Sequence, residues 1–367
     1  MTKANPDCLP GRSGAAMPVT FSLRNLLLNA VLLIGSVATV LLMAEAYFRW
    51  FDPQPIIPRY VETSPYGIRK NIGNVHGTMI TSEYRHAFNT NSQGFRGTKE
   101  YALQKPLGIY RVVVLGDSVA LGHGVDDSET FSAVLERKLS EVGPAEVINM
   151  GVSGFGTAEE LIQLRHVGLA YQPDLIILTY FQNDPYNNIV SKLFTVVNNT
   201  LIQQQETFVP AIFIRDRLYL IPGYSWLCQY SHVVNFFRNR VSAFFTGQLA
   251  QQNGISTETK EVLTSHEAQL TRYLLDAVIA ETGNHHIPLV ILNVPLVADG
   301  NIISNLPTEG LRADGESVMV LDLKTDIYAM HPVAALSYEK DSHPKPFAHR
   351  LIGERLAEEI EKRFRKN

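Results

Sequence analysis

Short apolar runs that alternate with helical patterns restrict the fold of this chain more than any other feature. Five runs have the length and β-branched content of buried strands, at residues 111–115 (RVVVL), 146–149 (EVIN), 175–180 (LIILTY), 289–294 (LVILNV) and 318–323. Helical patterns lie between or after them, at residues 130–142, 157–170, 259–282 and 346–365. Because apolar strands separated by helices form a parallel sheet covered on both faces, the sequence predicts a three-layer α/β/α domain.

A second constraint is the uncharged run over residues 26–44, LLLNAVLLIGSVATVLLMA. At about 1.5 Å per residue it is almost long enough to cross a hydrocarbon core of about 30 Å. Tyr47, Phe48 and Trp50 follow it, as an interfacial aromatic belt would. We therefore predict one uncleaved transmembrane helix. A signal peptide cleaved near Ala44 and a buried core helix are the alternatives, although the run exceeds the usual signal-peptide core of about 7–15 residues.

The basic residues around this run indicate its orientation. Lys3, Arg12 and Arg24 precede it, whereas Arg49 and Arg59 follow it. Cytoplasmic flanks carry the excess of Lys and Arg, so the pattern favours a cytoplasmic N-terminus. The rest of the chain is then expected on the periplasmic or extracellular side.

The sequence divides into four parts. They are a short tail (1–24), the anchor (25–46), a linker with an irregular N-terminal extension (47–108) and the α/β domain (109–367). Residues 185–255 form an insertion, in which the alternating pattern of residues 208–221 predicts a hairpin or extended pair. We interpret the insertion as a packed element with an ordinary core face; a lid or an acyl-chain pocket is the alternative.

Composition excludes several classes of function. The net charge of −4 argues against a nucleic-acid-binding protein, which would show a basic face. The two cysteines, Cys8 and Cys228, are too few for a disulfide scaffold or a Cys-rich zinc site. The glycines form neither a dinucleotide fingerprint nor a phosphate loop, and the pair His285-His286 has no partnering ligands nearby in sequence. These patterns give no sign of a zinc site, a dinucleotide site or a phosphate loop.

Polar residues follow the predicted strands, where sites form in open α/β sheets. The segments are Gly116-Asp117-Ser118, Asn149-Met150-Gly151-Val152-Ser153-Gly154, Phe181-Gln182-Asn183-Asp184 and, before the last helix, Asp341-Ser342-His343. A hydroxyl nucleophile needs a neighbouring base, and the base needs an orienting carboxylate. Ser118, His343 and Asp341 supply these three types. The backbone N–H groups of Ser118 and Gly154 and the side-chain amide of Asn183 are candidate donors to a developing oxyanion.

Other residues compete for these roles. Asp117 is expected to be a structural hydrogen-bonding group beneath the nucleophile, and Asp184 is a rival carboxylate in a turn before proline. His349 is the nearest rival of His343, but we expect it on the surface of the last helix. His123 could line the cleft.

These segments resemble the SGNH, or GDSL-type, hydrolase family. The resemblance is carried by VVVLGDSVALGHGV, VINMGVSGFGTAEEL, PDLIILTYFQND and DSHPKPFAHRLIGERLAEEI, over roughly residues 110–185 and 340–360. The stretch NSQGFRGTKEY (91–101) also looks like the lead-in of membrane-anchored members. The resemblance implies a flavodoxin-like five-stranded parallel sheet without metal or organic cofactor. It also implies Ser118 as nucleophile, Gly154 and Asn183 as oxyanion donors, His343 as base and Asp341 as its partner.

Three positions depart from the family pattern. Phe181 stands where the third block usually has glycine, and this side chain is expected to narrow the pocket mouth. One residue separates Asp341 from His343 instead of the commoner two. Ala348 replaces a frequent glycine.

The sequence thus predicts a membrane-anchored serine ester hydrolase that removes acyl or O-acetyl groups. An acylated small molecule or a glycan of the envelope or an exported polysaccharide is the expected substrate. Two alternatives remain open: an O-acyltransferase on a polysaccharide with the same triad, and a non-catalytic scaffold that retains the fold.

Overall fold

The computed structural model describes residues 22–209, 212–252, 263–313 and 316–365, and it divides into two units, residues 1–52 and 53–367. In the first unit, α1 spans Leu23–Phe51. In the part of the chain that the structure describes, it is the one helix whose length and composition suit a membrane crossing, and a signal sequence shares these properties. The apolar helix predicted from residue 25 onward is therefore present.

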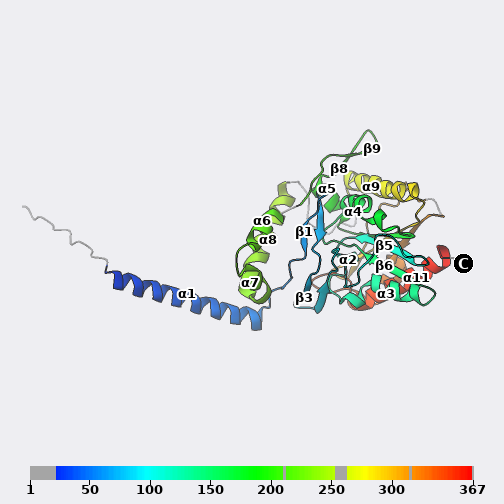
Figure 1. The fold of residues 1–367 in the computed structure, drawn as a ribbon. Coiled ribbons are helices and arrows are strands. Elements are labelled where there is room, and N and C mark those ends of the chain that lie inside the picture. Colours follow the sequence, from blue (N-terminus) through cyan, green and yellow to red (C-terminus); the bar gives the residue numbers. More distant parts are fainter. Residues whose placement is uncertain (1–21, 210–211, 253–262, 314–315, 366–367) are drawn as a thin grey trace, which may run out of the picture. The chain divides into compact units, whose positions relative to one another are not determined.

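The second unit is built on a five-stranded parallel sheet (Figure 1). Its strands are β5 (Tyr110–Gly116), β6 (Ala145–Asn149), β7 (Leu175–Phe181), β10 (Leu289–Val294) and β13 (Val318–Asp322). They lie in the order β13-β10-β7-β5-β6, with every neighbouring pair parallel. This is the flavodoxin-like order, in which the second strand in sequence is at one edge and the first is inside it. The predicted fold class is confirmed.

Helices cover both faces of this sheet. The helices are α3 (Phe131–Ser140) and α11 (Pro346–Arg363) on one face, and α4 (Thr157–His166) and α9 (Ser265–Asn284) on the other. Side chains alternate along β5, so Val112 and Val114 join the core beneath α3 and α11, whereas Val113 and Leu115 join the core beneath α4 and α9. Both faces of β5 are therefore shielded from water, which explains its continuous apolar run.

Smaller elements surround the sheet. Among the described residues the short strands pair as four antiparallel hairpins: β1 (Val61–Thr63) with β2 (Arg69–Asn71), β3 (His76–Ile80) with β4 (Arg85–Asn89), β8 (Phe194–Val197) with β9 (Thr200–Gln203), and β11 (Leu296–Ala298) with β12 (Asn301–Ile303). The remaining α-helices are α2 (Ser118–Leu121), α5 (Asp184–Ser191), α6 (Ile212–Tyr219), α7 (Tyr224–Tyr230), α8 (His232–Gln252) and α10 (Val333–Leu336). Residues 53–108 thus contain two hairpins and belong to the same compact unit as the sheet.

The hairpin predicted over residues 208–221 is wrong, because α6 occupies most of that segment. Alternation over so short an apolar run does not separate a strand from a helix. Tertiary contacts favour the helix: Arg215 Nη2 donates to the carbonyl of Val61 at 2.7 Å, and Asp216 Oδ1 accepts from Arg59 Nη2 at 2.6 Å. A described hairpin of the insertion is instead β8–β9, whose two turn residues both have positive φ, as a type I′ turn requires.

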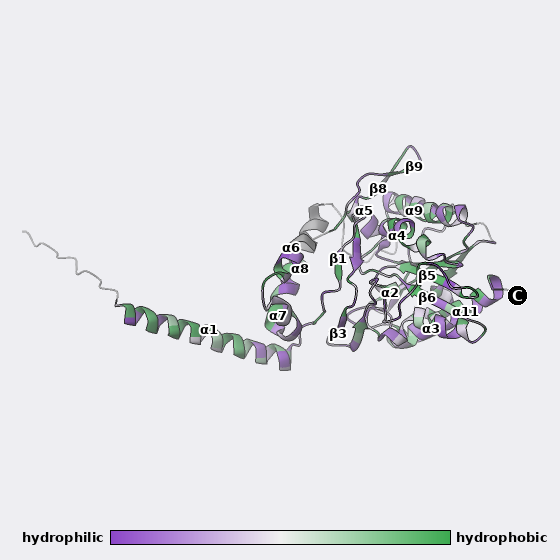
Figure 2. Cartoon of the chain, viewed as in Figure 1, coloured by the Kyte–Doolittle hydropathy of each residue, from purple (hydrophilic) through white to green (hydrophobic). Residues whose placement is uncertain are grey.

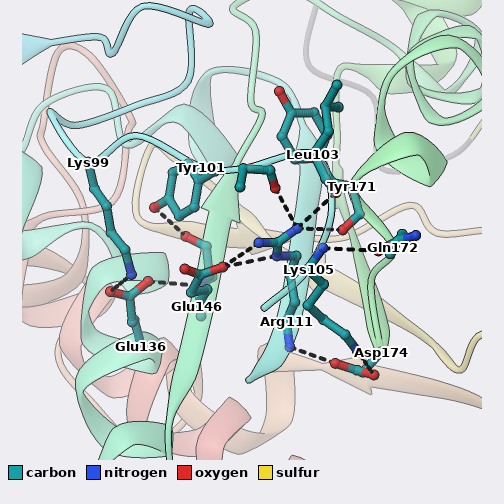
Figure 3. Close-up of polar contacts among 12 residues, drawn as sticks. Lys99, Tyr101, Leu103, Lys105, Arg111, Glu136, Glu146, Tyr171, Gln172 and Asp174 are labelled. Carbon is teal, nitrogen blue, oxygen red and sulfur yellow. Dashed lines mark hydrogen bonds and ion pairs between the residues drawn. The ribbon is translucent and has the colours of Figure 1, made fainter. Parts of the chain in front are cut away.

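A buried arginine ties the N-terminal extension to the sheet (Figure 3). The guanidinium of Arg111 on β5 donates to Glu146 Oε2 at 2.7 Å and to the carbonyls of Ala102 and Tyr171 at 2.8 and 2.7 Å. Arg111 stands at the start of β5, so this network lies at the opposite end of the sheet from the residues that follow β5.

Candidate active site

Ser118 is the first residue of α2, and one residue, Asp117, separates it from the end of β5. Gly116 is needed there, because a Cβ at this position would lie 2.6 Å from the Cβ of Ala120 and 2.8 Å from that of Thr179. The Asp117 carboxylate accepts a hydrogen bond from the Val119 N–H at 2.8 Å and so caps α2. A strand end and a capped helical turn therefore fix the position of the serine hydroxyl.

His343 joins this hydroxyl to a carboxylate. Its Nε2 lies 2.9 Å from Ser118 Oγ, and its Nδ1 lies 2.6 Å from Asp341 Oδ1. The side chains of His343 and Asp341 are 18% and 23% exposed, so both groups are shielded but open to a small molecule. The arrangement has the connections of a serine–histidine–carboxylate triad.

The short spacing between Asp341 and His343 is made possible by the backbone of Ser342. This residue has φ of +62°, in the left-handed region that non-glycine residues rarely adopt. The Ser342 N–H donates to the carbonyl of Tyr338, and the Tyr338 N–H donates to the carbonyl of His343. The chain therefore turns back sharply, and the carboxylate reaches the imidazole across a single residue.

Tyr84, from the N-terminal extension, donates its hydroxyl to the second oxygen of Asp341. Burial alone would raise the pKa of Asp341, but the hydrogen bonds from His343 and Tyr84 and the nearby histidines lower it, leaving it well below its ordinary value. The carboxylate thus stays ionised and can stabilise an imidazolium beside it.

Glu83 holds the backbone of the same loop. Its carboxylate accepts the N–H groups of Glu339, Lys340 and Asp341 at 2.8, 3.0 and 3.0 Å. Three consecutive N–H groups converging on one anion form a compact, charge-assisted cradle. Two neighbouring residues of the extension therefore position both the backbone and the side chain of Asp341.

His123 lies against the base. Its ring centroid is 4.6 Å from that of His343, and its Nε2 is 3.9 Å from Asp341 Oδ2. Burial, together with the repulsion of a charged His343, lowers the pKa of His123 to about 3. His123 is therefore neutral at ordinary pH, and it forms one wall of the triad.

The rivals of the triad residues have other partners. His349 lies in α11 as expected, but the prediction that it is a surface residue is wrong: it is fully buried, and its Nδ1 accepts from the Phe131 N–H at 3.1 Å. Its face of α11 packs against α3, which the position in the last helix alone did not reveal. Asp184 is also fully buried, and it lies 3.4 Å from Thr157 Oγ1. Neither residue contacts the Ser118 hydroxyl in the described hydrogen bonds.

Gly154 and Asn183 follow β6 and β7, so they lie at the same end of the sheet as Ser118. The amide of Asn183 forms a hydrogen bond with Asp117, the residue beside the serine. Gly154 has φ of +77°, and its carbonyl accepts from Arg69 Nη2. Their role as oxyanion donors remains a prediction.

The extension also contacts the loop that contains Gly154. Asn71 Nδ2 donates to the carbonyl of Gly151 at 2.8 Å, and the Tyr60 hydroxyl donates to Ser153 Oγ at 2.9 Å. Sequence reasoning placed no site residue before the first sheet strand. Glu83 and Tyr84 belong to no recognisable motif. The one sequence signal was that they lie in the N-terminal extension that precedes the α/β domain.

His123, Asp341 and His343 offer ligand atoms within 4.8 Å of one another. Their hydrogen bonds account for this closeness, since both nitrogens of His343 and both oxygens of Asp341 already have partners.

No family model matches the chain, and no curated protein matches it. Solved structures do match. A protein assigned to the G-D-S-L lipolytic family from Desulfitobacterium hafniense DCB-2 is 15% identical with a TM-score of 0.39, over 68% of this chain and 98% of its own. The esterase EstA from Pseudoalteromonas sp. is 13% identical with a TM-score of 0.39, over 69% and 97%. A two-domain esterase active on acetylated mannans is 10% identical with a TM-score of 0.41, over 70% and 50%.

The first of these is described as a member of the family that the sequence resembles. The chemistry of this chain rests on its own site: a hydroxyl, an imidazole and a carboxylate linked by hydrogen bonds at the carboxyl end of a parallel sheet.

Proposed function

We propose that this chain is a serine ester hydrolase with Ser118 as nucleophile, His343 as general base and Asp341 as the orienting carboxylate. The observation that carries the proposal is the continuous chain of hydrogen bonds from Asp341 through His343 to Ser118, at 2.6 and 2.9 Å. Isolated residues of these types are common, but this connection between residues 225 positions apart is what acyl transfer needs.

The proposed reaction has two halves. Ser118 Oγ attacks the ester carbonyl while His343 Nε2 takes its proton, and the Asp341 carboxylate stabilises the imidazolium. The tetrahedral intermediate collapses to an acyl-serine, and the departing alcohol receives the proton from His343. Water then attacks the acyl-serine with His343 again as base, releasing the acid and restoring the serine.

The proposal also assigns the hydrogen-bond donors to the oxyanion. The N–H groups of Ser118 and Gly154 and the Asn183 amide are assigned to the carbonyl oxygen as it becomes negative. The hydrogen bond between Asn183 and Asp117 supports this assignment, since it brings the amide next to the nucleophile.

The proposed substrate is an O-acyl group on a carbohydrate outside the cytoplasm, and α1 is the proposed membrane anchor. The charge bias around the apolar run supports this orientation.

Substitution of the nucleophile tests the proposal. Ser118→Ala is expected to remove about 10³-fold or more of kcat/KM for a p-nitrophenyl ester, because the acyl-enzyme no longer forms. Ser36→Ala, in α1 and outside the sheet domain, is the matched control and should keep full activity. Parental activity in the Ser118→Ala protein, or a folded parent protein that a fluorophosphonate does not label at Ser118, would contradict the assignment.

A further inference from the structure

The helices of the insertion expose large apolar side chains in a regular pattern. The apolar helix face consists of Trp226 and Tyr230 on α7 and of Phe237, Val241 and Phe244 on α8. Trp226, Phe237 and Phe244 are 62%, 61% and 62% exposed. Their spacings of four and seven residues place each set on one side of its helix. A water-soluble surface rarely carries so many exposed aromatic rings close together.

The other side of these helices is packed. Cys228, Val233 and Asn235 are buried, and Asn235 Nδ2 donates to the carbonyl of Cys228 at 2.8 Å. The two helices are therefore packed against each other through this buried side, and the apolar helix face is exposed. Figure 2 shows α6, α7 and α8 together at one edge of the second unit, with apolar colour on α7 and α8.

The charge of this region is one-sided. No aspartate or glutamate occurs from residue 217 to residue 252, whereas Arg217, Arg238 and Arg240 do. Arg240 lies over the ring of Phe236, with 4.9 Å from its guanidinium carbon to the ring centroid. Arginine beside exposed Trp, Tyr and Phe on one helix pair is the composition of an interfacial amphipathic element that binds anionic lipid.

The residues that follow α1 in the sequence contact this element. The N–H of Gln54, the third residue after Phe51, donates to His232 Nδ1 at 3.0 Å, at the start of α8. Arg238 Nη2 is within 3.4 Å of the Ile57 carbonyl. Only Asp52 and Pro53 separate the last residue of α1 from Gln54 in the sequence.

We infer that the apolar helix face of α7 and α8 binds the surface of a lipid bilayer that contains anionic headgroups. The aromatic side chains enter the headgroup and acyl boundary by about 5–10 Å, and the exposed Arg240 contacts lipid phosphates. The inference uses the membrane anchor of the proposed function but not its ester chemistry. A bilayer fits better than a partner protein because the chain itself delivers the face to the membrane and because the charge matches anionic lipid.

The two tryptophans of the chain allow a direct test, since Trp50 lies in the last turn of α1 and Trp226 lies on the apolar helix face. The full-length protein is reconstituted in vesicles of phosphatidylcholine and phosphatidylglycerol. Trp50→Phe leaves Trp226 as the single tryptophan, and Trp226→Phe leaves Trp50. In vesicles with lipids brominated near the headgroup end of the acyl chains, each variant is expected to lose about half of its emission.

The outcomes separate the anchor from the inference. Quenching of Trp50 without quenching of Trp226 overturns the inference and keeps the anchor, and quenching of neither overturns both. A second copy of the chain covering the face would protect Trp226 from brominated lipid, and that result also overturns the inference.

Serine substitutions add a matched comparison in the Trp50→Phe background. Replacing Phe237, Val241 and Phe244 together with serine is expected to reduce the quenching of Trp226 at least about two-fold. Exchanging the exposed Leu107 and Val142, which lie elsewhere on the domain, should leave it unchanged. Equal quenching in the two serine variants contradicts the inference.

Discussion

Tyr84 acts on the proposed reaction through another residue, since its hydroxyl donates to Asp341 and not to Ser118 or His343. Tyr84→Phe keeps the ring and removes this hydrogen bond to an anion, which contributes about 1.5–3 kcal/mol. We therefore expect kcat to fall about ten-fold or more with little change in KM. The downfield NMR signal of the proton between His343 and Asp341 should shift but persist. Tyr273→Phe, on α9 beside Arg272, is the control, and a fall in Tm without a change in kcat would contradict the positioning role.

Glu160 illustrates a buried group whose protonation affects folding. It is fully buried on α4, and neither carboxylate oxygen has a hydrogen-bond partner among the described residues. Burial, with repulsion from Asp117 and Glu159, raises the pKa of Glu160 well above its ordinary value. The folded protein therefore holds a proton that the unfolded chain releases above about pH 4.3, and the contribution of this group to stability falls as pH rises.

Glu160→Gln mimics the protonated carboxyl and should remove this pH dependence. We expect little change in stability at pH 5 and an increase at pH 8, with at most about 1.4 kcal/mol gained per pH unit. Buried His123 and His349 have pKa values lowered to about 3, so their contribution to stability falls as the pH falls, opposite to that of Glu160. Both histidines are present in the parent and in the variant. Thermal melts at both pH values check it, with the exposed Glu141→Gln as control. A variant that is less stable at pH 8 would disprove the raised pKa.

At the scale of elements, the Arg111 network joins the N-terminal extension to the start of β5. Arg111→Met leaves Glu146 and several carbonyls without their buried partner, so we expect a loss of about 3–5 kcal/mol in the free energy of unfolding. Lys105→Met, which breaks a partly exposed pair with Asp174, should cost at most about 1 kcal/mol. Because the network lies at the far end of the sheet from Ser118, kcat of the folded protein should stay the same. Urea titration measures the free energy of unfolding, and an esterase assay measures kcat.

The strands and sheet helices could be predicted from the sequence because burial on both faces of the sheet leaves unbroken apolar runs, which alternate with helical patterns. Residues 208–221 could not, since their alternation fits strand and helix alike, and contacts with Arg59 and Val61 decided between them. At the site, Ser118 follows a strand end, and His343 precedes the last helix, which is where the sequence placed both. The turn at Ser342 and the support from Glu83 depend on long-range packing that leaves no local pattern.

For the whole molecule, the two units differ in kind. In its described residues the first unit contains one apolar helix, and the second unit holds the sheet, the triad and the apolar helix face. A membrane-bound hydrolase that also rests on the lipid by its insertion would present its site at a restricted height above the bilayer. Acyl groups on glycans near the membrane would then be favoured over those on distant polymer.

Glu83 and Tyr84 stand far before the last strand, yet they hold the loop that carries Asp341. The acid-base apparatus is thus assembled only after opposite ends of the polypeptide have met. A shortened protein that kept only the recognisable hydrolase segments would lack Glu83 and Tyr84. Loss of activity in that protein would therefore say nothing about the activity of the longer chain.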